Sequence, residues 1–176
     1  MALSKIVTKS IADDAITIAK ATGFGKIGQV LTTEVTAFTF SSTATTPAAV
    51  TGLSRAITPS ATSSKILVMG KISFGSGLNA RGYVQLRRGT TLIGNSTAGG
   101  DRIISIASDQ IASVNDVANV NFNYIDSPST TSAVTYNIYG CAEASSNFLL
   151  NRSVNDTDAN SVTRGTSVIT VMEILA

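Results

Sequence analysis

The feature that most constrains this chain is a period-two alternation of apolar and polar residues, which runs from about residue 53 to the C-terminus. Segment 117–126 shows it most clearly, with apolar and aromatic residues in one set of positions and asparagines in the other: Ala118, Val120, Phe122 and Tyr124 against Asn119, Asn121 and Asn123. Successive side chains of a β-strand point to opposite faces, so this pattern predicts a strand with one dry face and one wet or interface face. Repeated strands of this kind predict a β-sandwich or barrel.

The length of 176 residues allows one domain of about 150 residues with a short appendage. A domain of that size needs no disulfide, and the single cysteine, Cys141, is expected to be a small buried hydrophobe. Segment 1–9 is too polar for a signal peptide, and no apolar run approaches the roughly 20 residues of a membrane span. The sequence therefore predicts no membrane insertion.

Charged residues are scarce, at 14% of the chain against about 25% in an ordinary soluble domain. The net charge is +2, so no electrostatic field for nucleic acid is expected. A surface of hydroxyl and amide groups suits a subunit of a crowded symmetric assembly, and it also suits an extracellular shell.

The chain has no histidine, which removes the usual general base and every Ser-His triad. Cys141 therefore lacks the partner that a thiol protease needs. The nearest approach to a metal motif is Asp156-x-Asp158-x-Asn160, but the glycine and glutamate of a calcium loop are missing, and Ser167 stands in the glutamate position. A polar loop tip is the favoured interpretation, and we expect no enzyme activity, cofactor or metal.

Residues 1–27 differ from the rest of the chain and are predicted to be an attachment segment, helical or extended. Ser10 and Asp13 fit a helix N-terminus. An apolar stripe follows at helical spacing, and its candidate attachment residues are Ile11, Ala15 and Ile18. Because so short a helix is marginal alone in water, it would be ordered only by packing on a partner, and a frayed tail is the alternative.

Residues 28–176 are predicted to form one all-β domain. The expected strands are 29–36, 53–58, 65–74, 83–87, 91–93, 103–107, 117–125, 133–142, 148–151 and 166–175, with a long polar connection at 41–50. Strands 65–74 and 166–175 are apolar on both faces, which predicts that both lie inside a sheet and have one further partner outside the sandwich. Long cross-connections favour an antiparallel jelly roll over a simple meander.

Several motifs resemble a domain that recurs in tail-fibre and virion structural proteins of bacteriophages, notably marine and cyanobacterial ones. They are Leu53-Ser-Arg-Ala-Ile-Thr-Pro-Ser60, Ser64-Lys-Ile-Leu-Val-Met69, Val84-Gln-Leu-Arg-Arg-Gly-Thr-Thr91, Tyr124-Ile-Asp-Ser-Pro-Ser-Thr-Thr131 with Tyr136, and Arg164-Gly-Thr-Ser-Val-Ile-Thr-Val-Met-Glu173. The resemblance covers about residues 28–176. It implies a jelly roll similar to tumour-necrosis-factor-like and head-fibre domains, usually a homotrimer that attaches to the virion by its N-terminus.

The first functional hypothesis is therefore a virion structural protein, either a short trimeric fibre or a capsid-surface protrusion that contacts the host. The expected trimer interface is Leu67, Met69, Ile169 and Val171. The expected host-contact loops carry Arg81, Arg88, Asp101, Asp156 and Asp158. The second hypothesis is a stand-alone carbohydrate-binding module or a capsid decoration module, against which the absence of tryptophan argues.

Overall fold

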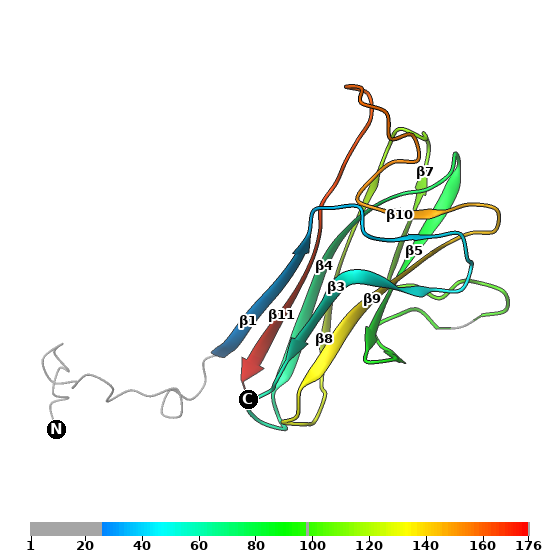
Figure 1. Ribbon diagram of the computed structural model, residues 1–176. Coiled ribbons are helices and arrows are strands. Elements are labelled where there is room, and N and C mark those ends of the chain that lie inside the picture. The colour runs from blue at the N-terminus through cyan, green and yellow to red at the C-terminus, as the bar shows by residue number, and fades with distance from the viewer. Residues whose placement is uncertain (1–25, 98, 176) are drawn as a thin grey trace, which may run out of the picture.

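The computed structural model describes residues 26–97 and 99–175, and in these residues it contains eleven strands and no helix (Figure 1). The strands are β1 (Lys26–Val35), β2 (Ser41–Ser42), β3 (Ala48–Ile57), β4 (Lys65–Gly75), β5 (Ala80–Arg88), β6 (Thr91–Leu92), β7 (Ala107–Ile111), β8 (Ala118–Asp126), β9 (Val134–Ala142), β10 (Phe148–Leu150) and β11 (Ser167–Leu175). The expected helix and the candidate attachment residues Ile11, Ala15 and Ile18 lie outside the described residues.

The strands form two antiparallel sheets that face each other. In sheet A the long strands run in the order β1-β11-β4-β8, and the short strands β10 and β2 continue the sheet beyond the end of β11. In sheet B the long strands run in the order β3-β9-β5-β7, and β6 forms a hairpin with β5. Among the eight long strands, the first and last are neighbours in one sheet, and the second and second-to-last are neighbours in the other. This arrangement is an antiparallel jelly roll, as the sequence predicts.

The core lies between the two sheets and follows the period-two pattern. The even-numbered apolar residues of β4 are all fully buried: Ile66, Val68, Ile72 and Phe74. The Phe74 ring stacks on Phe148 at 4.7 Å between ring centroids, which joins β4 to β10. Gly82 leaves the space for Phe74, because a Cβ atom there would lie 2.1 Å from the ring. The dry face predicted for strand 65–74 is therefore confirmed.

The C-terminal strand β11 lies between β1 and β4, which confirms that it occupies the interior of a sheet (Figure 1). Cys141 is buried, as expected, and burial raises the pKa of its thiol to about 11. Two parts of the sequence prediction are wrong. Segment 41–50 was expected to be a polar connection, but it contains β2 and the first residues of β3. Strand β7 spans Ala107–Ile111, whereas 103–107 was expected. Polar residues of β7 pair with β5 at a sheet edge, where alternation of apolar residues gives little signal.

Asn151 connects three elements at one end of the sandwich. Its backbone has a φ of 60°, in the left-handed region that asparagine tolerates better than most residues. The buried Nδ2 donates to the carbonyl of Val35 at 2.7 Å, and Oδ1 accepts from the Ser167 hydroxyl at 2.7 Å. The Asn151 N–H also donates to the carbonyl of Ser73. The chain can therefore turn from β10 into the following loop while β1, β4 and β11 keep their spacing.

Candidate functional site

The outer face of sheet A carries a continuous group of apolar side chains, which we call the apolar patch. Its members come from four adjacent strands: Ile27, Val30, Leu67, Met69, Ile125, Val168, Met172 and Ile174. The strand register places Val30, Met172, Leu67 and Ile125 in one row across the sheet. Ile27, Val30 and Ile125 are 58%, 53% and 54% exposed, which is unusual for large apolar residues gathered in one area.

Polar groups border the apolar patch on the same face. The next row toward the far end holds Thr32, Thr170, Met69 and Asn123, and the row beyond it holds Glu34, Val168, Lys71 and Asn121. A hollow of about 290 Å³ lies where the patch meets these rows, lined by Met69, Lys71, Asn121 and Val168 among others. An apolar centre with a polar rim is the usual anatomy of a protein–protein interface.

The structure divides the four residues that the sequence assigned to a trimer interface. Leu67 and Met69 lie on the outer face of β4, within the apolar patch. Ile169 and Val171 lie on the inner face of β11 and are fully buried in the core. Their assignment was wrong, because a side chain enclosed within its own sandwich cannot contact another subunit. Val168 and Met172, their neighbours of opposite parity, occupy the outer face instead.

The centre of the outer face of sheet B, around Gln85, is covered by contacts within the chain. Gln85 is only 5% exposed, because its amide donates to the carbonyl of Ile104 in the loop that follows β6. The Gln85 carbonyl oxygen accepts two bonds from Arg87, at 3.2 and 2.8 Å. The Arg87 guanidinium in turn lies 4.1 Å from the centre of the Tyr139 ring. This face therefore has few unsatisfied groups along its centre.

The arginines around the β5–β6 hairpin do not act as one basic cluster. Arg88 points inward and forms an ion pair of 2.8 Å with Asp126. The Tyr136 hydroxyl donates to the same Asp126 oxygen at 2.7 Å, and burial together with this bond raises the pKa of Tyr136 well above its usual range. Arg81 is exposed and makes only a long contact, 3.4 Å, to Gln110. Arg88 is therefore mainly a structural residue that links the ends of β5, β8 and β9.

A second buried carboxylate, Glu173, joins the ends of β1 and β11 to the β3–β4 connection. It accepts from the Ser60 N–H at 2.6 Å, from the Ser60 hydroxyl at 2.7 Å and from the Gln29 amide at 2.9 Å. Burial by itself would raise its pKa, but these donors outweigh burial and lower the pKa of Glu173 below its ordinary value. Both inward-facing carboxylates are therefore fully engaged in holding strands together.

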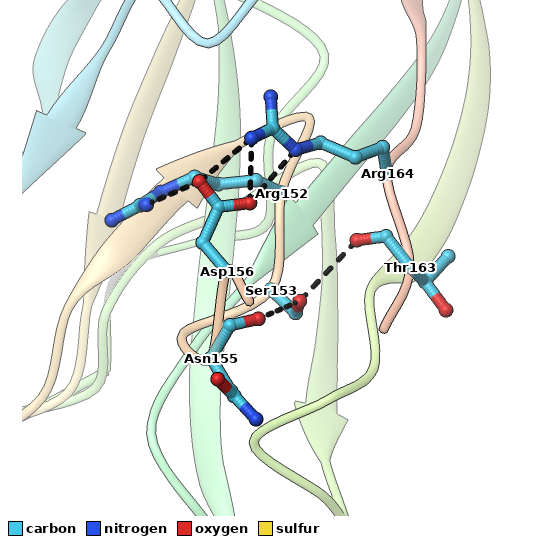
Figure 2. A network of polar contacts seen from close by, with 6 residues as sticks. All are labelled: Arg152, Ser153, Asn155, Asp156, Thr163 and Arg164. Carbon is cyan, nitrogen blue, oxygen red and sulfur yellow. Dashed lines mark hydrogen bonds and ion pairs between the residues drawn. The ribbon is translucent and has the colours of Figure 1, made fainter. Parts of the chain in front are cut away.

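The candidate cation loop is held by arginines (Figure 2). Asp156 accepts from Arg164 at 2.8 and 2.7 Å and from Arg152 at 2.9 Å. Hydrogen bonds from Arg152, and then from Arg164, lower the pKa of Asp156. Ser153 closes the base of the loop through its hydroxyl, which donates to the carbonyls of Asn155 and Thr163. Two guanidinium groups occupy the carboxylate, so the structure favours the interpretation as a polar loop tip.

The remaining predicted host-contact residues lie in different surroundings. Asp158 is exposed in the same loop as Asp156. Asp101 lines a cleft of about 660 Å³ on the outer side of sheet B, together with Tyr83, Arg102 and Glu143. No sequence motif indicates this cleft, because its members come from five separate segments. Whether any of these residues contacts a host stays a prediction.

The described residues contain neither a metal-binding cluster nor a membrane-spanning helix. Nowhere in residues 26–97 and 99–175 do three His, Cys, Asp or Glu side chains gather as a metal ion would require. Over the same ranges, no helix has the length and apolar character needed to cross a membrane.

No protein-family model matches the sequence, and no curated protein matches it. Among solved structures, the chain is similar to the crystal structure of the infectious bursal disease virus VP2 subviral particle, with 12% identity and a TM-score of 0.38. It is also similar to the structure of the Gx strain of that virus, with 11% identity and a TM-score of 0.33. The likeness covers 83% and 84% of this chain and 39% and 40% of those chains, so this chain spans less than half of their length.

Proposed function

We propose that this chain is a structural, non-enzymatic subunit that associates with further copies of itself through the apolar patch. The observation that carries this proposal is the row of Val30, Leu67, Ile125 and Met172 across the outer face of sheet A. Exposed apolar residues that are scattered singly are normal, but a contiguous group with a polar border marks an interaction surface. Covering it would remove apolar area from water, at roughly 25 cal/mol for each Å².

The partner that best fits the apolar patch is a second copy of the chain. The chain carries only two net positive charges, so identical copies repel each other weakly. Strand β1, which carries Ile27 and Val30, is at the edge of sheet A and has no strand partner on its outer side among the described residues. Burial of the patch in an oligomer would also cover this edge, which otherwise invites uncontrolled pairing with other strands.

The finer form of the proposal is a homotrimer within a phage virion, located on the particle surface. Support comes from the motif resemblance described above and from the low charge of the chain. In this arrangement residues 1–27 attach the subunit to other virion proteins, and the jelly roll of residues 28–176 projects outward. The loops that carry Arg81, Asp101, Asp156 and Asp158 then become available for contact with a host surface.

The self-association is tested by measuring the solution mass of the full chain by light scattering. We expect a trimer for the natural sequence and a monomer for the double variant Val30→Glu/Ile125→Glu, because each substitution places a charge in the apolar patch. Both side chains are more than half exposed, so the substitutions should leave the fold intact. A monomeric natural chain, or a trimeric double variant, would overturn the proposal.

The matched control is Leu78→Glu. Leu78 is 62% exposed but lies in the connection between β4 and β5, away from the apolar patch. This variant should remain trimeric, and its dissociation would show that the loss of assembly is not specific to the patch. The virion location is tested separately by mass spectrometry of purified particles of the encoding phage, in which peptides of this chain are expected.

A further inference from the structure

We infer that the cleft on the outer side of sheet B binds a neutral oligosaccharide. The cleft has a volume of about 660 Å³ and opens on the side of the sandwich opposite to the apolar patch. It therefore stays accessible when sheet A is covered by other subunits. The inference rests on the lining of the cleft and holds whether or not the chain forms a trimer.

Five segments build the cleft, and the connection between β2 and β3 contributes Thr45. Strand β5 supplies Tyr83, and β7 supplies Ser108, which is its register partner. The loop after β9 supplies Glu143, whose N–H is fixed by a bond to the carbonyl of Arg81. The loop between β6 and β7 supplies Asp101 and the residues that follow it. The floor is therefore rigid sheet, and the walls are loops.

Three polar side chains of the cleft are available for a ligand, while Arg102 uses one N–H to bind the carbonyl of Gly99 at 3.0 Å. The side chains of Asp101 and Glu143 make no hydrogen bond or ion pair with any other described residue, and neither does the Tyr83 hydroxyl. By contrast, the inward-facing carboxylates Asp126 and Glu173 each accept at least two hydrogen bonds. Acceptors without partners in a concave site are what a polar ligand needs for orientation and specificity.

The chemistry of these groups favours a sugar. Carboxylates accept bonds from hydroxyl groups, the Arg102 guanidinium donates to ring and hydroxyl oxygens, and a half-buried tyrosine offers a flat face to a pyranose ring. Ser105 and Ser108 add hydroxyls that can both donate and accept. Two carboxylates against one guanidinium leave the cleft with a net negative charge. Acidic sugars are therefore disfavoured, and neutral hexose or N-acetylhexosamine units fit.

The affinity of a single cleft should be weak. The lining has one aromatic side chain, and the chain has no tryptophan to provide a larger stacking surface. A dissociation constant of about 1 mM is the order expected for so few contacts. Several copies in one assembly would raise the apparent affinity through multivalent binding.

The inference is tested by following the NMR spectrum of the full chain during titration with cellotetraose, chitotetraose and tetragalacturonate. At least one of the two neutral tetrasaccharides should bind with millimolar affinity, and the acidic one should bind more weakly. Asp101→Asn and Glu143→Gln should each weaken binding about tenfold, since a neutral amide replaces a charged acceptor of the sugar hydroxyls. Tyr83→Ala should weaken it further.

The matched control is Asp116→Asn, which removes an exposed carboxylate in the loop between β7 and β8, outside the lining of the cleft, and should leave binding unchanged. The cleft carboxylates make no contacts that hold the fold, so an unchanged melting temperature of Asp101→Asn/Glu143→Gln verifies that the double variant is folded. The inference is overturned if neither neutral tetrasaccharide binds, if the folded double variant binds as well as the natural chain, or if tetragalacturonate binds best.

Discussion

The outer faces of the two sheets differ in how far the chain itself covers them. On sheet B, Gln85 is held between the carbonyl of Ile104 and the guanidinium of Arg87, which in turn stacks on Tyr139. On sheet A, Val30 and Ile125 remain more than half exposed. The difference shows that the chain covers the centre of one outer face, around Gln85, with its own loop and leaves large apolar side chains of the other outer face exposed.

Two strands that look alike in the sequence illustrate the same point. Strands β4 and β5 are both central in their sheets and both strongly buried on the inner side. The outward residues of β4 include Leu67 and Met69, which carry no hydrogen-bonding group that a loop could satisfy. The outward residues of β5 include Gln85, whose amide can bind a passing loop. The identity of the outward side chains therefore decides which face is closed within the chain.

The largest expected effect tests the separation of inner and outer faces on β11. Ile169→Ala should lower the free energy of unfolding by about 2–5 kcal/mol, because it opens a cavity in the core. Val168→Ala, on the apolar patch, should change the free energy of unfolding of the subunit by less than about 1 kcal/mol. Urea denaturation of the two variants measures the difference. Equal losses would mean that the register of β11 is not as described.

A smaller effect tests the closure of sheet B. Gln85→Ala should lower the free energy of unfolding by about 1–3 kcal/mol, because the Ile104 carbonyl and the Arg87 guanidinium both lose a buried partner. Thr170→Ala is the matched change on the outer face of sheet A, where the hydroxyl bonds only to the exposed Thr32, and it should cost about 0.5 kcal/mol or less. Thermal melting of the two variants measures both losses. A larger loss for Thr170→Ala than for Gln85→Ala would contradict the closure of sheet B around Gln85.

The smallest expected effect is a pH dependence of the folding stability that association through the apolar patch should not share. The folded state lowers the pKa of Glu173 below its ordinary value of 4.5, so its stabilisation is complete above pH 4.5 and is lost as the pH falls through the folded pKa. The apolar patch contains no titratable group, so association should not share this dependence. Thermal melting from pH 7 to pH 3 measures the loss for the natural chain.

The matched variant for this pH series is Glu173→Gln. It should be less stable than the natural chain at pH 7 by about 1 kcal/mol, since an amide replaces a charge-assisted acceptor of the Ser60 bonds. Its melting temperature should fall less steeply at acid pH. An identical acid dependence in the two proteins would show that Glu173 does not contribute in this way.

The strands were largely predictable, whereas the sites were predictable only in part. Alternation located β4, β8, β9 and β11 to within a residue or two, because a strand that is half buried carries its own pattern. It failed for β7, which is polar and pairs with β5 at a sheet edge. It identified Leu67 and Met69 as outward residues, but the choice between the two apolar faces of β11 was wrong for Ile169 and Val171.

The cleft of sheet B could not be found in the sequence. Tyr83, Asp101 and Glu143 are far apart in the chain and belong to no common motif, and they meet only because β5 lies between β7 and β9. The same is true of Asp126 and Arg88, whose ion pair depends on the two sheets facing each other. Long-range contacts of this kind leave no local pattern for sequence reasoning to detect.

The sequence by itself determined the all-β class, the position of most strands and the residues that form the dry face of β4. Those features follow from local alternation, since each strand must bury one of its two faces. Only the tertiary structure decided which face of β11 is covered by the sandwich, which outward residues adjoin one another in the apolar patch, and which carboxylates are left without partners. Those outcomes depend on strand order and register, which are set by the packing of both sheets together.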